Sequence, residues 1–586
     1  MESSAERLRL RTKTGCLTCR KRRVKCDESK PHCSRCTSTG RKCDGYALTS
    51  PPRYGGLVRW SPPLIATPSS GRGDAQETRA FQFFYERTVP SLSGYCGSAF
   101  WNRLVLQVSQ HEKSVWHALI ALGSLHENFE NDQRIPGLWF SRRGYDDFAV
   151  REYLLAIRAL IGPTRSLKQG TRGSSPAEPL TVDVYLISCI LFACFEVLSS
   201  HYDSAINHIR AGIKIISETN YDRASGTFCH PNLRPSTVTG LEIGTLRKML
   251  IQLQDQAFTL TREGIDDELV HSTRYESALQ HDMTIPDEFH SVAEARDVFE
   301  YYRHKAARQL RADAEGDKGT PSTADIQEYG SIIQQFEPVL GRMLSALDRL
   351  EQRTITTPNA REQIGVKILK IHTYMHRIRL EYAKLGVSDQ MSWDRYNHMF
   401  DEMVSLAASM VDQTNGVECL SLSPSQLDRL SRDGYLKPSF TMDLGINGPV
   451  FNVATMCRDP IIRRKAVRVL RAASRQEGCY NSHICAVVAE YAIAAEEGAA
   501  TALLVASGNS REGPSGLSPA TLVPLNQGLG SITQSYQVPE EARLAYIYPR
   551  VDATRKKVYI RLCKGGVDVD VDIGLPATSA VNDMIL

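Results

Sequence analysis

Six closely spaced cysteines near the N-terminus constrain this chain more than any other feature. The chain holds 15 cysteines in 586 residues, and six of them fall within the first 43. These six are Cys16, Cys19, Cys26, Cys33, Cys36 and Cys43. They run through the same Cys-x2-Cys-x6 spacing twice, so the repeat predicts a small module built from two related halves.

The surroundings of these cysteines favour a metal site over disulfide bonds. Residues 1–11 are charged and lack the apolar stretch of a secretory signal, so we expect an intracellular chain, in which paired cysteines mostly bind metal. A structural zinc takes four ligands in a tetrahedron. Six thiolates therefore either close one site with two left over or close two sites that share two sulfurs. We expect His32 to be a loop residue, because the thiolates fill these sites.

The module has little apolar surface of its own. Leu17 and Val24 are its main apolar side chains. Since so small a core stabilises a fold weakly, we expect zinc binding to supply most of the folding free energy.

Positive charge is concentrated in the same segment. Residues 1–46 carry 13 Lys+Arg against 5 Asp+Glu, whereas the remainder carries 57 against 61. A basic head on a nearly neutral body is typical of a chain that binds a polyanion, which predicts double-stranded DNA as a partner. A nuclear-import signal or a solvated basic face is the alternative interpretation. Five of the six residues between Cys19 and Cys26 are basic, namely Arg20, Lys21, Arg22, Arg23 and Lys25.

The segment from Cys16 to Glu28, followed by Pro31 and Cys33, resembles the fungal binuclear zinc-cluster (six-cysteine) transcription factors. This resemblance implies two zinc ions per chain, held by all six cysteines. In the implied arrangement Cys16 and Cys33 bridge both ions, Cys19 and Cys26 complete one site, and Cys36 and Cys43 complete the other.

The resemblance also implies a mode of DNA recognition. Arg22 and Arg23 are expected at the base-reading end of a basic helix in the major groove, with CGG-type triplets as the target. Arginine donors suit the guanine acceptors of that groove. We expect Arg20, Lys21 and Lys25 to contact phosphates, which position the module and make binding salt-dependent.

Composition changes after the basic head. The sequence divides into a zinc-cluster DNA-binding domain at 1–46, a flexible Pro/Gly/Ser-rich linker at 47–78, a helical domain at 79–545 and a tail at 546–586. The linker shows no sustained heptad, so it predicts no coiled coil and leaves homodimerisation open.

Helical periodicity dominates the large domain. Apolar residues recur at helical spacing in 184–198 and 206–216, which predicts core helices. The longest apolar run, 184–195, is too short to cross a bilayer, so we expect no membrane partner. Two segments, 79–123 and 457–464, resemble the fungal-specific transcription factor domain that accompanies such zinc clusters. This resemblance implies a large, mostly all-α regulatory domain without known chemistry.

One helix has a well-marked start. Asp459 is a candidate N-cap and Pro460 a candidate first residue, and the helix is expected to run through Leu470. Its apolar residues are expected to face the core and its cations to form a solvated face. The cations are Arg463, Arg464, Lys465, Arg468 and Arg471.

Loops and strands are expected elsewhere. Gly, Pro, Ser and Thr cluster at 162–179, 312–325 and 508–535, which predicts loops. Near the C-terminus, the alternating segments 558–562 and 567–573 predict a β-hairpin. The aspartates of the second segment do not follow a calcium-loop pattern. An acidic tail that recruits coactivators is the alternative role for this region.

The body contains no complete catalytic constellation, so we expect no enzyme activity. His111 and His126 each precede a glutamate but lack the second histidine of a zinc-protease helix. Closed all-thiolate sites leave no position for a catalytic water. The expected function is a nuclear, sequence-specific, zinc-dependent regulator of genes transcribed by RNA polymerase II, with coactivators or corepressors as candidate partners. A zinc-built interaction scaffold or a thiol sensor is the competing function.

Overall fold

The computed structural model divides the chain into two units, residues 1–72 and residues 73–586, called here the N-terminal unit and the helical unit. The residues that the structure describes are 16–22, 24, 26–27, 29, 33–43, 74–95, 98–131, 147–169, 180–222, 227–235, 245–247, 249–253, 284–312, 323–355, 359–384, 389–508, 532–552, 557–564 and 567–572. The expected linker lies mostly outside them, since the gap runs from 44 to 73.

The N-terminal unit shows its repeat in the backbone. Helix α1 (Leu17–Lys21) follows Cys16, and helix α2 (Ser34–Thr37) follows Cys33. The amide of Val24 donates to the Cys19 carbonyl at 3.1 Å, and the amide of Arg41 donates to the Cys36 carbonyl at 3.0 Å. Both bonds span five residues at equivalent repeat positions. The two halves therefore share one local fold as well as one cysteine spacing.

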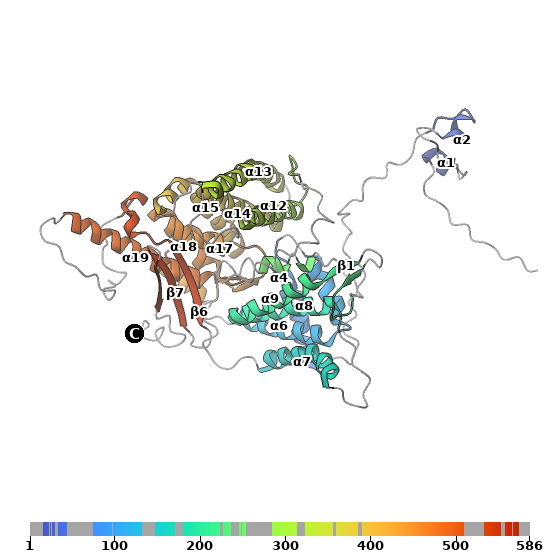
Figure 1. Ribbon diagram of the computed structural model, residues 1–586, viewed down its shortest axis with the longest axis horizontal. Helices are drawn as coiled ribbons and strands as arrows, with labels where there is room; N and C mark the ends of the chain where they lie inside the picture. The colour runs from blue at the N-terminus through green and yellow to red at the C-terminus, as the bar shows by residue number, and fades with distance from the viewer. Residues whose placement is uncertain are drawn as a thin grey trace, which may run out of the picture. The chain divides into compact units, whose positions relative to one another are not determined.

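The helical unit begins with a group of helices packed around α6 (Figure 1). The Asp74 carboxylate accepts hydrogen bonds from the amides of Gln76 and Glu77 and so caps the first helix, which starts at Ala75. Helix α6 packs against α3, α7 and α8, and α8 packs against α9. The elements of this part are α3 (Ala75–Phe83), η1 (Phe84–Thr88), α4 (Val89–Leu92), η2 (Phe100–Leu104), α5 (Val105–Ser109), α6 (Lys113–Asn131), α7 (Asp147–Gln169), α8 (Val182–Leu198) and α9 (Tyr202–Glu218).

Helix α8 is an almost completely buried element of this group. Every residue from Val182 to Leu198 is buried except Tyr185. A helix that is apolar on all sides belongs in a protein core, and the predicted core helices α8 and α9 are confirmed. Among the helices the structure describes, none is both long enough and apolar enough to span a membrane.

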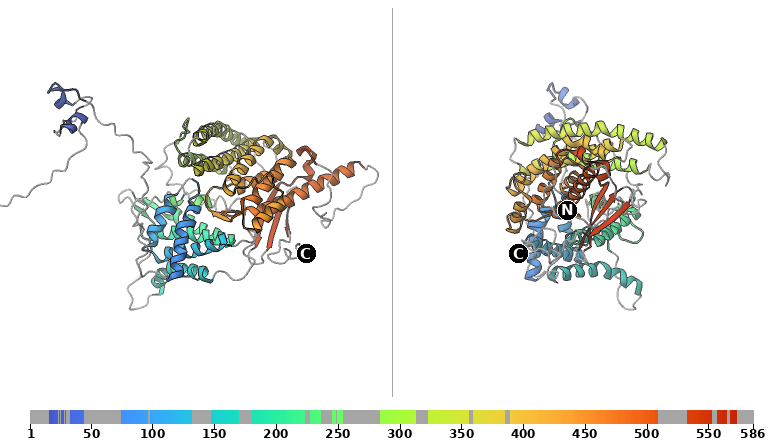
Figure 2. Two further views of the ribbon diagram at one scale, coloured as in Figure 1. Left: turned by 180° about the vertical axis from the view of Figure 1, so that it is seen from behind. Right: turned by 90° about the vertical axis from the view of Figure 1, so that its left-hand side faces the viewer.

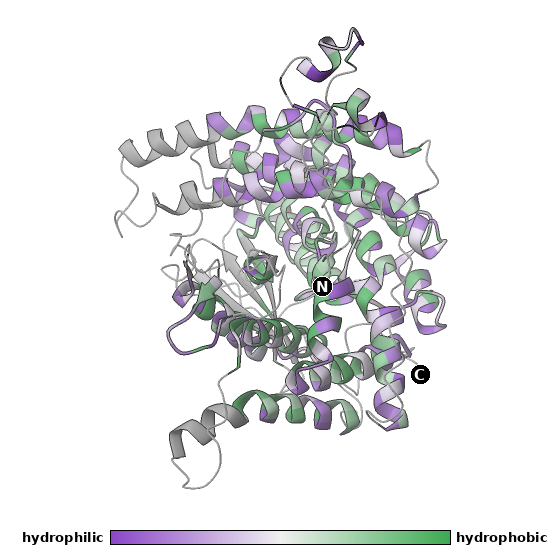
Figure 3. Ribbon diagram, turned by 90° about the vertical axis from the view of Figure 1, so that its right-hand side faces the viewer, coloured by the Kyte–Doolittle hydropathy of each residue, from purple (hydrophilic) through white to green (hydrophobic). Residues whose placement is uncertain are grey.

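A second group of helices contains a large apolar core. Helices α12, α13 and α14 lie side by side, and α15, α17, α18 and α19 continue the packing (Figure 2). The helices carry both hydrophilic and hydrophobic residues along their length (Figure 3). The elements are α12 (Val292–Ala312), α13 (Thr323–Ile355), α14 (Ala360–Lys384), η5 (Gln390–Tyr396), α15 (Asn397–Asn415), α16 (Pro424–Arg432), α17 (Asn447–Met456), α18 (Pro460–Ala473), α19 (Ser482–Gly508), η6 (Ser535–Gln537) and η7 (Glu540–Ala542).

Within the part of the chain that the structure describes, three small sheets accompany the helices. Two of them are β1 (Asn220–Asp222) with β2 (Thr227–Cys229), and β3 (Ser439–Thr441) with β4 (Arg475–Glu477) and β5 (Tyr480–Asn481). The third joins β6 (Tyr546–Asp552), β7 (Lys557–Lys564) and β8 (Val567–Asp572) in that order, all antiparallel.

The predicted C-terminal hairpin is confirmed as β7 and β8, with Lys564 opposite Val567. The sequence did not predict the third strand, β6, which contains Pro549. Proline donates no ladder hydrogen bond and is confined to edge strands, and β6 is an edge of this sheet. Pro549 interrupts the alternation of polar and apolar residues in this segment, so the sequence pattern did not indicate a strand.

The predicted helix from Pro460 is confirmed as α18, with the Asp459 carboxylate accepting from the amides of Ile461 and Ile462. The expectation of a solvated basic face holds for Arg464, which is exposed, and is wrong for the other four cations. Arg463 is fully buried, and Lys465, Arg468 and Arg471 are half-buried. These cations have acidic or carbonyl partners on neighbouring elements, which explains their burial.

The expected loops are partly wrong. Helix α7 continues through residues 162–169, and α13 already begins at Thr323. Most of the remaining loop positions, 170–179, 313–322 and 509–531, lie outside the described residues.

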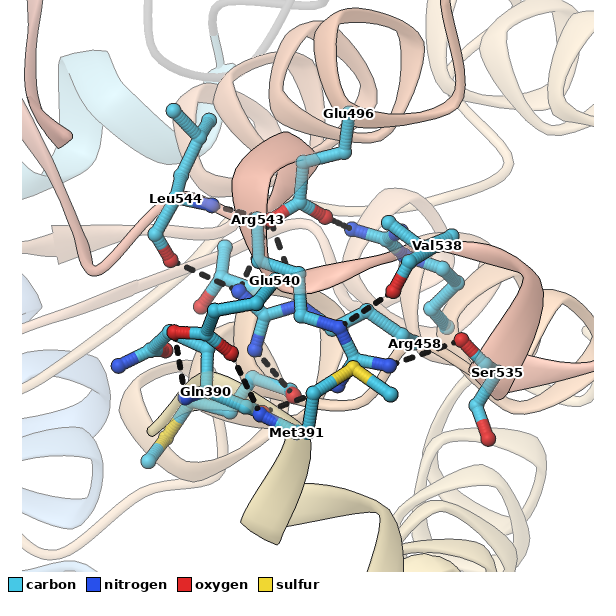
Figure 4. Close-up of polar contacts among 12 residues, drawn as sticks. Gln390, Met391, Arg458, Glu496, Ser535, Val538, Glu540, Arg543 and Leu544 are labelled. Carbon is cyan, nitrogen blue, oxygen red and sulfur yellow. Dashed lines mark hydrogen bonds and ion pairs between the residues drawn. The ribbon is translucent and has the colours of Figure 1, made fainter. Parts of the chain in front are cut away.

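Buried ion pairs connect α18 and α19 to the segment before β6 (Figure 4). Glu496 on α19 accepts from Arg458 Nη2 at 2.8 Å and from Arg463 Nη2 at 2.7 Å. The amide of Leu544 donates to the same carboxylate at 2.8 Å, and the Leu544 carbonyl accepts from Arg458 at 2.7 Å. A continuous polar network thus crosses the core.

A second arginine fixes the same segment against η5. Arg543 forms two 2.8 Å bonds with the Asp394 carboxylate and donates to the Val538 carbonyl at 2.7 Å. The Glu540 carboxylate accepts from the amides of Gln390 and Met391, both at 3.0 Å (Figure 4). The segment that leads into the C-terminal sheet is therefore held by side chains from two directions.

Candidate metal centre and nucleic-acid interface

The six cysteines converge on one point in the N-terminal unit. Cys16 Sγ lies 3.5 Å from Cys33 Sγ and 3.8 Å from Cys36 Sγ, and Cys19 Sγ lies 3.7 Å from Cys33 Sγ. A zinc tetrahedron with Zn–S of about 2.3 Å has its sulfurs about 3.8 Å apart. The spacing of these sulfurs therefore suits tetrahedral zinc coordination.

The sulfurs form two groups of four with shared members. Within each group all the sulfurs lie within 4.8 Å of one another, and Cys16 and Cys33 belong to both groups. The structure thus brings together all six of the predicted ligands. The groups are Cys16, Cys19, Cys26 and Cys33, and Cys16, Cys33, Cys36 and Cys43.

These sulfurs also form the buried interior of the N-terminal unit. Cys16, Cys19, Cys33 and Cys36 are fully buried, whereas Val24 is 36% exposed. Desolvation raises the pKa of the Cys16 thiol to about 12 and raises the pKa of the Cys33 thiol as well. Since these groups would otherwise stay protonated, a bound cation is what would hold them as thiolates. The donor chemistry therefore fits zinc, and the apolar side chains contribute little to the core.

Asp27 joins the two halves of the unit and was not singled out from the sequence. Its carboxylate accepts from the amides of Ser34 and Arg35 at the start of α2, both at 2.9 Å, and from the Ser29 hydroxyl. These hydrogen bonds, led by the one from Ser29, lower the pKa of Asp27. Asp27 follows the ligand Cys26 directly, so it fixes the end of the first half against the second.

The predicted DNA-contacting residues are only partly described. Lys21 ends α1 and Arg22 follows it, and both side chains are exposed. For Arg20 the structure describes the backbone, which lies in α1. Arg23 and Lys25 lie outside the described residues, as does His32.

The two halves differ in charge although they share a fold. In the first half Lys21 and Arg22 lie at the end of the helix, while Ser38 and Thr39 occupy the equivalent positions of the second. Arg41 and Lys42 are the cations between Cys36 and Cys43. Phosphates and guanine edges attract cations. The first half is therefore the better candidate for the surface that faces DNA.

Comparison with protein families gives two matches. Residues 14–52 match the fungal Zn(2)-Cys(6) binuclear cluster domain, and residues 79–286 match the fungal specific transcription factor domain. The first match contains all six cysteines. The second covers the group of helices around α6.

Several fungal proteins are similar in sequence to this chain. The aspercryptin biosynthesis cluster-specific transcription regulator atnN of Emericella nidulans is 23% identical, over 81% of this chain and 85% of its own length. The transcriptional regulatory protein moc3 of Schizosaccharomyces pombe is 46% identical over 12% of this chain and 14% of its own length. Transcription regulator lscL of Purpureocillium lilacinum is 26% identical over 34% of this chain and 48% of its own length. Comparison with the solved structures finds no match.

Proposed function

Because this chain belongs to the fungal Zn(2)-Cys(6) transcription factors, which are DNA-binding regulators and not enzymes, we propose that it reads CGG-type triplets near genes transcribed by RNA polymerase II. The N-terminal unit, with the domain taken as residues 1–46, carries the recognition. The helical domain, taken as residues 79–545, regulates it. The protein acts in the nucleus.

Zinc holds the recognition module in shape. We assign two ions per chain to the two sulfur groups, with Cys16 and Cys33 bridging. The bound ions supply charge neutralisation and fixed geometry rather than a reactive position, because thiolates fill every coordination site. The support for this assignment is the sharing of Cys16 and Cys33 by two groups of four sulfurs.

The basic segment after the second cysteine supplies the DNA contacts. Arg22 and Arg23 are assigned to guanine edges in the major groove, where a bidentate arginine discriminates between bases by about 1 to 3 kcal/mol. Arg20, Lys21 and Lys25 are assigned to phosphates, which add affinity without sequence preference. The observation that carries this proposal is the charge difference between two halves of the same fold.

That charge difference also gives the test a matched control. In the full-length protein, the double variant Arg22→Ala and Arg23→Ala is expected to lose preference for CGG-containing duplexes over a randomised duplex while it keeps its zinc. The double variant Arg41→Ala and Lys42→Ala removes the same charge from the other half and is expected to keep the preference. Equal loss in both variants would show that net charge, and not the first half, determines recognition.

The helical unit is the candidate for binding protein partners. We propose that the helical domain or the C-terminal tail, residues 546–586, contacts coactivators or corepressors. Homodimerisation through the helical domain is compatible with the absence of a predicted coiled coil in residues 47–78. Deletion of 546–586 with measurement of reporter expression distinguishes the tail from the domain.

A further inference from the structure

Three side chains from three different helices meet at one surface of the helical unit. Glu77 comes from α3, His117 from α6 and Glu152 from α7. Each offers one ligand atom, and these atoms all lie within 4.8 Å of one another. His117 Nδ1 lies 2.7 Å from Glu152 Oε2. The side chain of Glu152 is 1% exposed and that of His117 is 21% exposed, so the group is built into the packing.

The backbone that carries these side chains is well fixed. The Asp74 cap holds the amide of Glu77 at 2.8 Å, in the first turn of α3. Helix α6 packs against both α3 and α7. Since each residue lies on a regular helix, the three donors converge through the tertiary fold rather than through one loop.

The charges of this group differ from those of the neighbouring contacts. Nearby, arginines pair with glutamates of α6, as in Arg79–Glu127 at 2.6 Å and Arg87–Glu130 at 2.8 Å. Glu77 instead faces another carboxylate, and among the described residues it has no lysine or arginine ion-pair partner. The exposed Arg151 reaches only the other oxygen of Glu152, at 3.4 Å. The ligand atoms of Glu77 and Glu152 lie within 4.8 Å of each other, so the two negative charges repel.

A divalent cation would relieve this repulsion. An imidazole nitrogen and carboxylate oxygens form a mixed donor set that suits zinc and neighbouring transition metals, whereas magnesium and calcium prefer oxygen alone. The cation would take the place of the hydrogen that His117 and Glu152 share. Three protein ligands leave the fourth position of a zinc tetrahedron to water.

We propose that Glu77, His117 and Glu152 bind one zinc-class divalent cation that fastens α3, α6 and α7 together. This site is separate from the cysteine cluster in sequence and in donor type. With one position open and no thiolate, it releases its ion to a chelator more readily than the cluster does. The ion links the start of the helical unit to α7, so its binding stabilises this group of helices.

Metal content of the full-length protein tests the proposal. The wild-type chain is expected to carry one more zinc equivalent than the variant Glu77→Gln, with the same loss in His117→Gln. The control is Glu127→Gln, which removes a carboxylate from α6 outside the group and is expected to keep the extra ion. Circular dichroism checks that helix content is equal, so that a folding failure is not mistaken for loss of the site.

Cobalt substitution separates the two kinds of site. Thiolate-bound cobalt gives sulfur-to-metal charge-transfer absorption, whereas nitrogen and oxygen ligands do not. The Glu77→Gln variant is expected to keep the charge-transfer absorption of the wild type while it binds one fewer cobalt. Equal metal content in the wild type and Glu77→Gln would overturn the proposal, and so would a loss of the extra ion in Glu127→Gln.

Discussion

Arg463 and Glu496 form an ion pair with both side chains fully buried and 2.7 Å between Nη2 and Oε2. Arg458 shares the same carboxylate from the residue before the α18 cap. The two guanidiniums lower the pKa of Glu496 although burial alone would raise it. Two buried guanidiniums are therefore neutralised by one buried carboxylate. Of the residues in this network, Glu496 is the one whose replacement we expect to destabilise the fold most.

Replacing Glu496 by Gln is expected to destabilise the protein by about 3 to 5 kcal/mol, because two buried guanidiniums lose their counter-ion. The half-exposed pair Lys465–Asp401, at 2.9 Å, provides the control. Asp401→Asn is expected to change stability by less than about 1 kcal/mol. Urea unfolding followed by circular dichroism measures the free energy of unfolding of both variants. An equal loss of stability in the two would show that burial does not determine the cost of removing a carboxylate.

The packing of α6 against α3 predicts a cost for added volume at Gly123. A Cβ at this position would lie 2.3 Å from the Ala80 carbonyl oxygen and 2.9 Å from Phe84 Cβ. Gly123→Ala is expected to lower stability by about 1 to 3 kcal/mol. At Gly498 on α19 nothing lies within 4 Å of an added Cβ. Gly498→Ala should raise stability slightly, by about 0.5 to 1 kcal/mol, because alanine favours the helix. Thermal unfolding of the two variants should therefore shift in opposite directions.

Buried histidines predict loss of stability in acid. Burial, with a smaller contribution from Arg87, lowers the pKa of His126 to about 3, and burial lowers that of His372 to about 4. Below the unfolded pKa of about 6.5 the unfolded chain binds protons that the folded chain does not, so stability falls as the pH decreases from there. Unfolding midpoints between pH 7 and pH 4.5 measure this fall. In His126→Gln, stability should decrease less between pH 7 and pH 4.5 than it does in the wild type. Replacement of the exposed His111 by Gln serves as the control and should leave this decrease unchanged.

The contact of Asp27 with α2 predicts an effect on metal retention. Asp27→Asn leaves one carbonyl oxygen for two amides and removes the charge that they stabilise. Residues that orient metal ligands typically change metal affinity by about 10- to 100-fold when they are replaced. We expect zinc to transfer to a competing chelator at correspondingly lower chelator concentration. Transfer at the wild-type concentration would show that Asp27 does not support the cluster.

The parts of this structure that the sequence predicted are those encoded by local spacing. The spacing of the six cysteines along the sequence, from Cys16 to Cys43, implies two related halves. Asp459 and Pro460 mark the start of α18. The apolar run 184–195, interrupted by Ser188, likewise identifies α8, because a helix that is apolar on nearly all sides has to be buried.

The parts that were missed depend on contacts between distant segments. Arg463 and Glu496 lie on different helices, so the amphipathic pattern of α18 alone assigned the arginine to solvent. The same limit applies to Glu77, His117 and Glu152, which only the packing of three helices brings together. Strand β6 was missed for a local reason, since Pro549 interrupts its alternation.

We propose that six thiolates and two zinc ions build a module that reads DNA sequence. Zinc content and duplex selection, measured on the full-length protein with and without chelator, test this proposal. We expect two thiolate-bound zinc ions per chain and enrichment of CGG-type triplets from a randomised duplex pool, and we expect this enrichment to be lost when chelator removes the cluster ions. Selection that persists after those ions are removed, or two bound ions with no sequence enrichment, would contradict it.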